Sequence, residues 1–124
     1  DGGIRIAGRV KDIVVRGGEN ISVKEVEDYL LEHPAVADVA IVGVPDDTLG
    51  ERACAFVVTP EDAPPPTLRE LGAFLLEHDI AKHKLPEYLL VTDRLPRTES
   101  GKIQKFRLRE RAVRELAEGR GERR

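Results

Sequence analysis

The chain has 124 residues and a net charge of −3 at pH 7, which suits one domain with a modest hydrophobic core. Its single cysteine, Cys54, excludes a disulfide within the chain and lies in an apolar stretch, which indicates a buried small hydrophobe. No apolar run approaches the roughly 20 residues that span a bilayer and no signal peptide is visible, so we expect a cytoplasmic protein without a membrane span.

Positive charge is concentrated at the C-terminal end. From Lys102 onward the chain has nine Lys and Arg against four Asp and Glu, and a basic segment of this kind can bind nucleic acid. Here aromatic residues are scarce, and Glu110, Glu115 and Glu118 alternate with arginines, which is typical of a salt-bridged helix face. We therefore expect no nucleic-acid partner.

The first third of the chain is predicted to contain two short strands and one amphipathic helix. Gly17 and Gly18 predict a turn that leads from the second strand toward the helix. Ser22 and Glu25 have the spacing of a capping box at the start of that helix, and the proline after His33 marks its end. The elements expected here are strands over Ile4–Ile6 and Asp12–Arg16 and a helix over Val23–Glu32.

Three strands and two helices are predicted over the rest of the chain. The turn around Asp46 and Asp47, which we interpret as turn formers, fits an antiparallel pair of strands. Thr67 and Glu70 have the spacing of a second capping box. The elements expected here are strands over Val36–Val44, Ala53–Thr59 and Glu87–Thr92, a helix after Thr67 and a helix from about Lys105.

This order of elements predicts an α+β domain, with a small mixed β-sheet flanked by helices and preceded by a short two-stranded β element. We expect the domain to cover residues 1–117 and the charged end, residues 118–124, to be a frayed tail. On element order alone the fold would be ferredoxin-like, and such domains often serve as small-molecule regulatory or protein-interaction modules. A module of that kind is the alternative from a different functional class.

The most informative stretch is Leu95-Pro96-Arg97-Thr98-Glu99-Ser100-Gly101-Lys102-Ile103-Gln104-Lys105. A loop of small and polar residues here presents Lys102 directly after a glycine that permits a tight turn or a positive φ. The ammonium group of a lysine is a compact charge with three donors, suited to carboxylate or phosphate oxygens. A P-loop is excluded, because it requires glycine and Ser or Thr where this chain has Pro96 and Ile103. A solvated surface lysine is the plain alternative.

Three segments in this order and spacing carry a family resemblance: Gly8-Arg9-Val10-Lys11-Asp12, Arg16-Gly17-Gly18-Glu19-Asn20 and the Lys102 loop. Together they resemble the C-terminal domain of the AMP-forming acyl-CoA synthetases. These enzymes belong to the adenylate-forming superfamily, with aryl-acid and amino-acid adenylation domains and luciferases. The resemblance extends from the first residues to about Leu116. Because the chain lacks methionine and opens on Asp1, we expect it to be part of a longer protein.

The resemblance implies a two-step ligase. A carboxylate first attacks the α-phosphate of ATP, giving an acyl-adenylate and pyrophosphate, and the thiol of coenzyme A then displaces AMP. In this family the large N-terminal domain binds ATP, Mg²⁺ and the carboxylic acid, and the C-terminal domain is a mobile lid. The expected partners are the enzyme's own N-terminal domain, the acid and coenzyme A. The isolated lid is expected to be inactive.

The resemblance also implies roles for individual residues. Lys102 matches the catalytic lysine, which bridges carboxylate and α-phosphate oxygens and stabilises the charge of the transition state. Lys11 matches the hinge, and Arg9 matches the nucleotide-binding arginine beside it. Gly17-Gly18-Glu19-Asn20 matches the segment that lines the pantetheine tunnel. The residues expected to support the catalytic loop are Thr98, Ser100 and Gly101.

Two alternatives remain for the acceptor and the acid. The Gly-Gly-Glu-Asn and Gly-Lys-Ile-Gln-Lys sequences look most like short- or medium-chain, alicyclic or aromatic acyl-CoA ligases. The alternative within the family is an aryl-acid adenylation enzyme that loads the pantetheine of a carrier protein. We expect no metal site in this domain, because His33, His78 and His83 lack the spacing of metal ligands.

Overall fold

The computed structural model describes residues 13–123 of the chain. The strand expected over Ile4–Ile6 and two expected site residues, Arg9 and Lys11, lie outside the described residues. The described elements, in chain order, are β1 (Ile13–Arg16), β2 (Glu19–Ser22), α2 (Lys24–Leu30), β3 (Asp38–Asp46), β4 (Gly50–Val58), α3 (Leu68–Glu77), the 3₁₀ helix η1 (Lys82–Lys84), β5 (Tyr88–Val91), α4 (Lys105–Ala117) and β6 (Glu122–Arg123).

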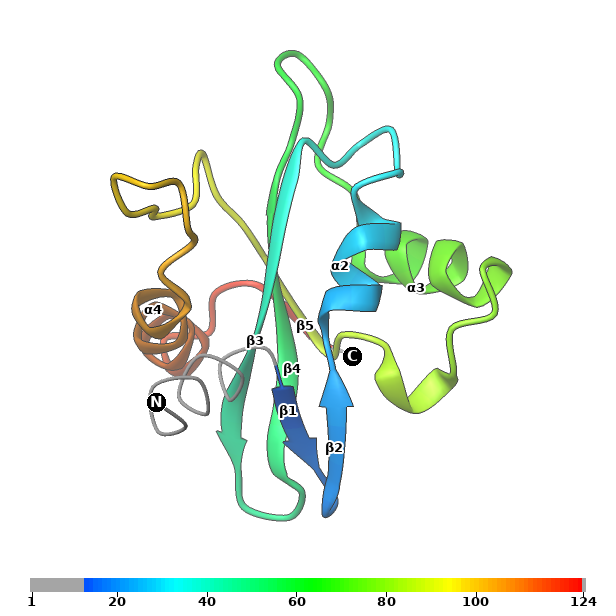
Figure 1. The fold of residues 1–124 in the computed structure, drawn as a ribbon, viewed down its shortest axis with the longest axis vertical. Helices are drawn as coiled ribbons and strands as arrows, with labels where there is room; N and C mark the ends of the chain where they lie inside the picture. The colour runs from blue at the N-terminus through cyan, green and yellow to red at the C-terminus, as the bar shows by residue number, and fades with distance from the viewer. Residues whose placement is uncertain (1–12, 124) are drawn as a thin grey trace.

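The described strands form one mixed sheet built around β4 (Figure 1). β3 and β4 are long antiparallel neighbours, with Asp38 opposite Val58 and Asp46 opposite Gly50. β5 lies parallel to β4 after the crossover through α3, and β6 is antiparallel to β5. The β1–β2 hairpin joins the sheet where Arg16 lies opposite Gly50. A mixed sheet with helices on its faces confirms the predicted α+β class.

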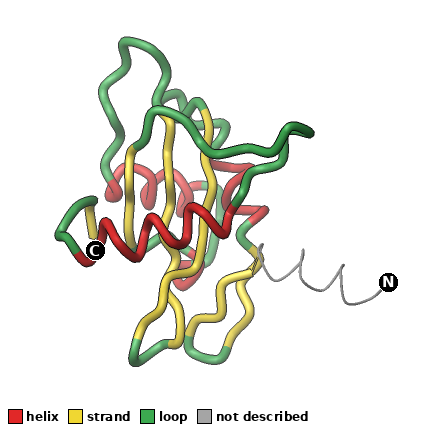
Figure 2. The backbone as a smooth tube through the Cα atoms, turned by 90° about the vertical axis from the view of Figure 1, so that its left-hand side faces the viewer, coloured by secondary structure: helices red, strands yellow, loops and turns green. Residues whose placement is uncertain are grey.

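Two hydrophobic cores lie on opposite faces of the sheet, because successive residues of a strand point to opposite faces. α2 and α3 cover one face and α4 covers the other (Figures 1 and 2). In β4, Ala53, Ala55 and Val57 belong to the first core, whereas Cys54 and Phe56 belong to the second. The prediction of a buried Cys54 is confirmed, and this burial raises the pKa of its thiol to about 12.

The two predicted capping boxes have different outcomes. At α3 the Thr67 hydroxyl accepts the Glu70 N–H (3.0 Å) and the Glu70 carboxylate accepts the Thr67 N–H (2.9 Å), so this box is confirmed. At α2 the predicted box of Ser22 and Glu25 is wrong. Ser22 is the last residue of β2, and Val23 occupies the N-cap without a side-chain hydrogen bond. Burial of its apolar face, rather than a cap, therefore stabilises α2.

The described C-terminal end of the chain includes a short strand, within the segment 118–124 for which a frayed tail is predicted. Glu122–Arg123 forms β6 beside β5, and the Glu122 carboxylate accepts the N–H of Leu68 at the start of α3 (2.7 Å). Gly121 permits this close approach, because its φ is +80° and a Cβ there would lie 2.6 Å from Cδ2 of Leu90. Residues 122–123 therefore contact β5 and the start of α3.

Candidate functional site

The Lys102 loop is a short, hydrogen-bonded segment between β5 and α4. Arg97 and Ile103 form an antiparallel bridge across its base. At its tip the Gly101 N–H donates to the Thr98 carbonyl (2.9 Å), and the Thr98 N–H donates to the Lys102 carbonyl (2.8 Å). Gly101 has a φ of +93°, which confirms the predicted positive φ. The loop therefore holds the backbone of Lys102 in a defined turn.

The predicted supporting residues surround that turn. Thr98 Oγ1 accepts the Lys102 N–H (3.2 Å) and lies 2.9 Å from Ser100 Oγ. The Arg97 guanidinium donates to the Gly101 carbonyl (2.7 Å). The Lys102 side chain is exposed, and no residue within 13–123 forms a hydrogen bond or ion pair with its ammonium group. A cation at the tip of an ordered loop is thus available to an external carboxylate or phosphate.

The Gly17-Gly18 segment is the turn of a β-hairpin, which corrects the predicted strand-to-helix turn. Arg16 lies opposite Glu19, so the connection has two residues, and their φ values of +59° and +82° are typical of a type I′ turn. A Gly-Gly pair between two strand-like runs is itself a signal of a hairpin, so the sequence could have predicted β2. A Cβ on Gly18 would meet no atom of residues 13–123 within 4 Å, and Gly17 to Asn20 are all exposed. The surface above this turn is open.

Four charged residues connect this hairpin to the sheet. Glu87, just before β5, accepts from Arg16 Nε (2.9 Å) and from Arg52 Nη1 (2.5 Å). Arg52 also donates to Asp46 (Nε to Oδ1, 2.6 Å), which accepts two N–H groups of the β3–β4 turn as predicted for a turn former. The bond from Arg52 is the main cause of the lowered pKa of Asp46, and it also raises the pKa of Arg52. Sequence reasoning missed this network, because no local pattern signals it.

Basic residues of η1 lie beside the same hairpin. His83 Nε2 is 3.0 Å from Oε2 of Glu19, and Lys82 and Lys84 flank this histidine. Three consecutive basic residues are a signal that sequence reasoning left unused. A cavity of about 530 Å³ opens here, and its lining residues are Arg16, Lys82, His83, Leu85 and Glu87. The hairpin therefore has donors and positive charge on one side.

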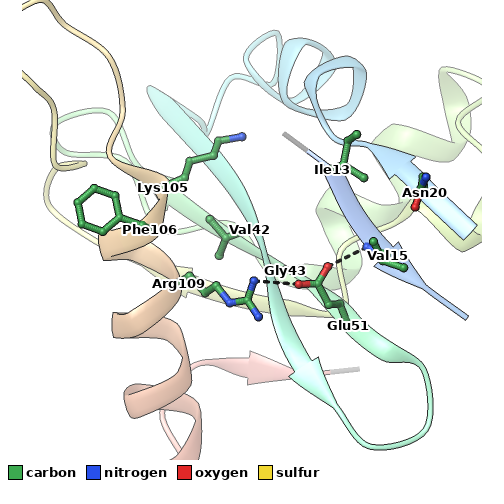
Figure 3. Close-up of a pocket in the computed structure, with 9 residues that line it drawn as sticks. All are labelled: Ile13, Val15, Asn20, Val42, Gly43, Glu51, Lys105, Phe106 and Arg109. Carbon is green, nitrogen blue, oxygen red and sulfur yellow. Dashed lines mark hydrogen bonds and ion pairs between the residues drawn. The ribbon is translucent and has the colours of Figure 1, made fainter. Parts of the chain in front are cut away.

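Another cavity, of about 360 Å³, lies between the hairpin, β3 and the start of α4 (Figure 3). Its lining includes Glu51, whose carboxylate accepts the Val15 N–H (2.8 Å) and pairs with Arg109 (Oε2 to Nη1, 3.0 Å). Gly43 leaves room for this group, because a Cβ there would lie 2.8 Å from the Glu51 carboxylate. Glu51 thereby joins β1 to α4 across β3.

The Lys102 loop and the Gly17-Gly18 hairpin lie at opposite ends of the β3–β4 ribbon (Figures 1 and 2). The loop is attached at the first residue of β3, where Arg97 pairs with Asp38 (2.5 Å). The hairpin is attached at the other end, where the Gly17 N–H donates to the Leu49 carbonyl (2.7 Å). At about 3.3 Å per residue, the length of β3 separates these attachments by about 26 Å. The two segments therefore cannot occupy one reaction centre in a single orientation of the domain.

Comparison with known proteins connects this geometry to a family. The family model for the AMP-binding enzyme C-terminal domain matches residues 25–102, a stretch that begins in α2 and ends on Lys102. The chain belongs to this family. The match to the model includes the whole β3–β4 ribbon and the tip of the Lys102 loop, while the Gly17-Gly18 hairpin precedes it.

The matches to curated relatives and to solved structures cover more of this chain than the family model does. The medium-chain fatty-acid–CoA ligase of Escherichia coli K12 is 51% identical over 117 residues, which cover 94% of this chain and 21% of that protein. The 2,3-dihydroxybenzoate-AMP ligase of Bacillus subtilis 168 is 44% identical over 119 residues, with coverages of 96% and 22%. The crystal structure of an acyl-CoA synthetase from Brucella canis has a TM-score of 0.77 and 35% identity, covering 88% of this chain and 20% of that one. The chain thus spans about a fifth of the length of these relatives.

The part of the chain that the structure describes has neither a membrane-spanning helix nor a cluster of metal-binding side chains. No helix within residues 13–123 is both long enough and apolar enough to cross a bilayer. In the same range, no three His, Cys, Asp or Glu side chains gather where they could hold a metal ion. The histidines have other neighbours: the rings of His33 and His78 lie against Phe74, and His83 lies against Glu19.

Proposed function

We propose that this chain is the mobile C-terminal lid of an AMP-forming acyl-CoA synthetase. A preceding N-terminal domain would bind ATP with its Mg²⁺ and the carboxylic acid. The observation that carries the proposal is the exposed Lys102 at the tip of an ordered loop, in a chain of the AMP-binding enzyme C-terminal domain family. The names of its relatives, which include a medium-chain fatty-acid–CoA ligase, support the same reaction class.

Lys102 acts in the first half-reaction. The carboxylate oxygen attacks the α-phosphorus of ATP, and the bond to pyrophosphate breaks. Two anions must approach each other, and negative charge increases on the α-phosphate oxygens in the transition state. An ammonium group placed between them offsets the repulsion and stabilises that charge. Thr98, Ser100 and Gly101 hold the turn that presents it.

The β1–β2 hairpin acts in the second half-reaction. The thiol of coenzyme A attacks the acyl carbonyl, loses its proton, and AMP departs as the carbon–oxygen bond breaks. The surface above Gly18 suits a thin pantetheine arm, because no atom of the described residues lies within 4 Å of the position that a Cβ would take there. Lys82 and Lys84, beside the hairpin, supply positive charge of the kind that the phosphates of coenzyme A require.

The lid must present these two ends in turn. A separation of about 26 Å along β3 means that the lid has to rotate between the half-reactions. Lys11 is the proposed hinge and Arg9 the proposed contact to the nucleotide. Both precede β1, where a few backbone torsions can redirect the whole sheet as a rigid body.

A second candidate keeps the first half-reaction and changes the acceptor. The B. subtilis relative named 2,3-dihydroxybenzoate-AMP ligase matches 96% of this chain. The parent enzyme would then activate an aryl acid and load the pantetheine of a carrier protein. Rates of transfer to free coenzyme A and to a phosphopantetheinyl carrier protein, measured with the same acyl-adenylate, distinguish the two.

The test is Lys102→Ala in the full-length enzyme, with each half-reaction measured in single turnover. Loss of one positioned cation should lower the rate of adenylate formation by about 10²–10³-fold. Thioester formation from supplied acyl-adenylate should stay within about threefold of wild type, because the lid has rotated by then. Lys24→Ala, an exposed lysine of α2, is the matched control and should change neither rate. Equal losses of both steps in Lys102→Ala would contradict the proposal.

A further inference from the structure

Lys105, the first residue of α4, contradicts two local rules of helix formation. A cation at a helix N-terminus opposes the helix dipole, and a lysine is rarely buried unless it is paired. Yet the side chain of Lys105 is only 9% exposed. A residue that contradicts local preference in this way is expected to be stabilised by a specific tertiary partner.

A partner within residues 13–123 is Glu27, in the first turn of α2. Its Oε2 lies 2.7 Å from Nζ of Lys105, and the carboxylate is 15% exposed. The same oxygen accepts the N–H of Ile41 in β3 (2.7 Å). α2 and α4 cover opposite faces of the sheet, so this ion pair passes around the edge of β3 and joins the two layers. Figure 3 shows Lys105 extending from the start of α4 toward β3.

A second ion pair holds the other end of the Lys102 loop to the same edge. Arg97 pairs with Asp38, the first residue of β3, and Asp38 also accepts the N–H of Val39 (2.9 Å). β4 is the sheet partner of β3 among the described strands, so the outer N–H groups of β3 need other acceptors. Both carboxylates therefore satisfy an edge N–H and hold one end of the loop.

We infer that the ion pair of Lys105 and Glu27 positions Lys102. By fixing the start of α4 to the edge of β3, the pair would hold the Lys102 ammonium group at the reacting oxygens. The inference rests on the proposed function. Lys102 is exposed and three residues from Lys105, so a shift at the start of α4 reaches the ammonium group directly. Displacement of a catalytic group by about 1 Å can cost about 10²-fold in rate.

The experiment uses the full-length enzyme and four variants. Glu27→Gln removes the negative charge but keeps an acceptor for the Ile41 N–H, and Lys105→Met removes the positive charge at similar volume. Each single variant removes one partner of this buried ion pair and should lower the melting temperature. Glu27→Gln/Lys105→Met is neutral and should recover stability. Lys105→Arg keeps the positive charge and should keep the ion pair with Glu27.

Two rates and one local measurement are recorded for each variant. We expect both single variants to form adenylate about 10–100-fold more slowly, while thioester formation from supplied acyl-adenylate stays within about threefold. Hydrogen exchange of the 96–104 peptide should be faster. The neutral double variant should regain thermal stability but not the adenylation rate. Lys105→Arg should stay within about threefold of wild type in every measurement.

The control for charge and location is Asp28→Asn, which removes an exposed partner of Lys24 on the same helix and should leave all three measurements unchanged. Recovery of both stability and adenylation in the double variant would overturn the inference, because the pair would then be structural only. Unchanged loop exchange and unchanged adenylation in Glu27→Gln would overturn it as well. Lys102→Ala is measured in parallel. If Lys102→Ala keeps its adenylation rate, the proposed function fails, while the exchange data still report on the loop.

Discussion

Replacing Glu87 by glutamine should destabilise the fold through the network that connects the hairpin to the sheet. The Glu87 carboxylate is 12% exposed and accepts from three donors: Arg16 Nε at 2.9 Å, Arg16 Nη2 at 3.4 Å and Arg52 Nη1 at 2.5 Å. Glutamine has one acceptor oxygen, and its amide group would face a guanidinium. Two arginines would then share one neutral acceptor.

The expected magnitude follows from these contacts. A hydrogen bond to a charged group contributes about 1.5–3 kcal/mol. The side chains of Arg16 and Arg52 are 29% and 31% exposed, so water screens part of the loss. We therefore expect Glu87→Gln to lower the free energy of unfolding by about 2 kcal/mol. For a domain of this size that corresponds to a melting temperature lower by about 8 °C.

Urea and thermal unfolding of Glu87→Gln, followed by circular dichroism, provide the measurement. Asp28→Asn is again the control, since it breaks a pair whose Nζ to Oδ2 distance is 3.6 Å and whose side chains are 75% and 59% exposed. Its free energy of unfolding should change by less than about 0.5 kcal/mol. If Glu87→Gln is as stable as Asp28→Asn, the network is a surface feature and the reasoning fails.

Two further predictions concern the proposed hinge and the buried thiol. Lys11→Pro fixes φ near −65°, and this variant should still form acyl-adenylate but not thioester. Lys11→Ala keeps the backbone free and should keep most of both rates. If single-turnover assays show identical losses for the two variants, a backbone hinge is ruled out. Because burial raises the pKa of Cys54 to about 12, its reaction with Ellman's reagent at pH 8 should be about 10³-fold slower in the native state than in urea. The unfolded thiol ionises near pH 9 and the folded one does not, so stability should fall as pH rises from about 9 toward 12; fast native labelling would contradict this burial.

Local signals predict most of the described fold. The Thr67 capping box forms, since its two residues meet through local hydrogen bonds at the start of α3. The Ser22 box fails because pairing with β1 extends Ser22 into a strand, where its backbone is not that of an N-cap. The pairing of residues 122–123 with β5 is a tertiary effect that the charged composition of this segment does not encode.

The candidate site also has a part that local sequence predicts and a part that depends on tertiary contacts. The Lys102 loop is recognisable from sequence because its turn is made by residues 97–103 alone. The groups that hold the candidate sites in place are distant in sequence: Lys105 and Glu27 are 78 residues apart, and Arg16 and Glu87 are 71 apart. In the sequence, each of these residues cannot be told from an ordinary surface charge, because its partner is close only in the folded sheet.

The β3–β4 ribbon also has an evolutionary consequence. The Lys102 loop is attached to one of its ends at Asp38 and the Gly17-Gly18 hairpin to the other at Leu49, and substitutions at sites farther apart than about 10 Å usually have additive effects. Under the proposed function, changes around the Gly17-Gly18 hairpin would therefore adapt the domain to a new thiol acceptor with little effect on the presentation of Lys102 at the other end. With those proposed roles, a ribbon of this kind would let the acceptor change while the chemistry of carboxylate activation is inherited unchanged.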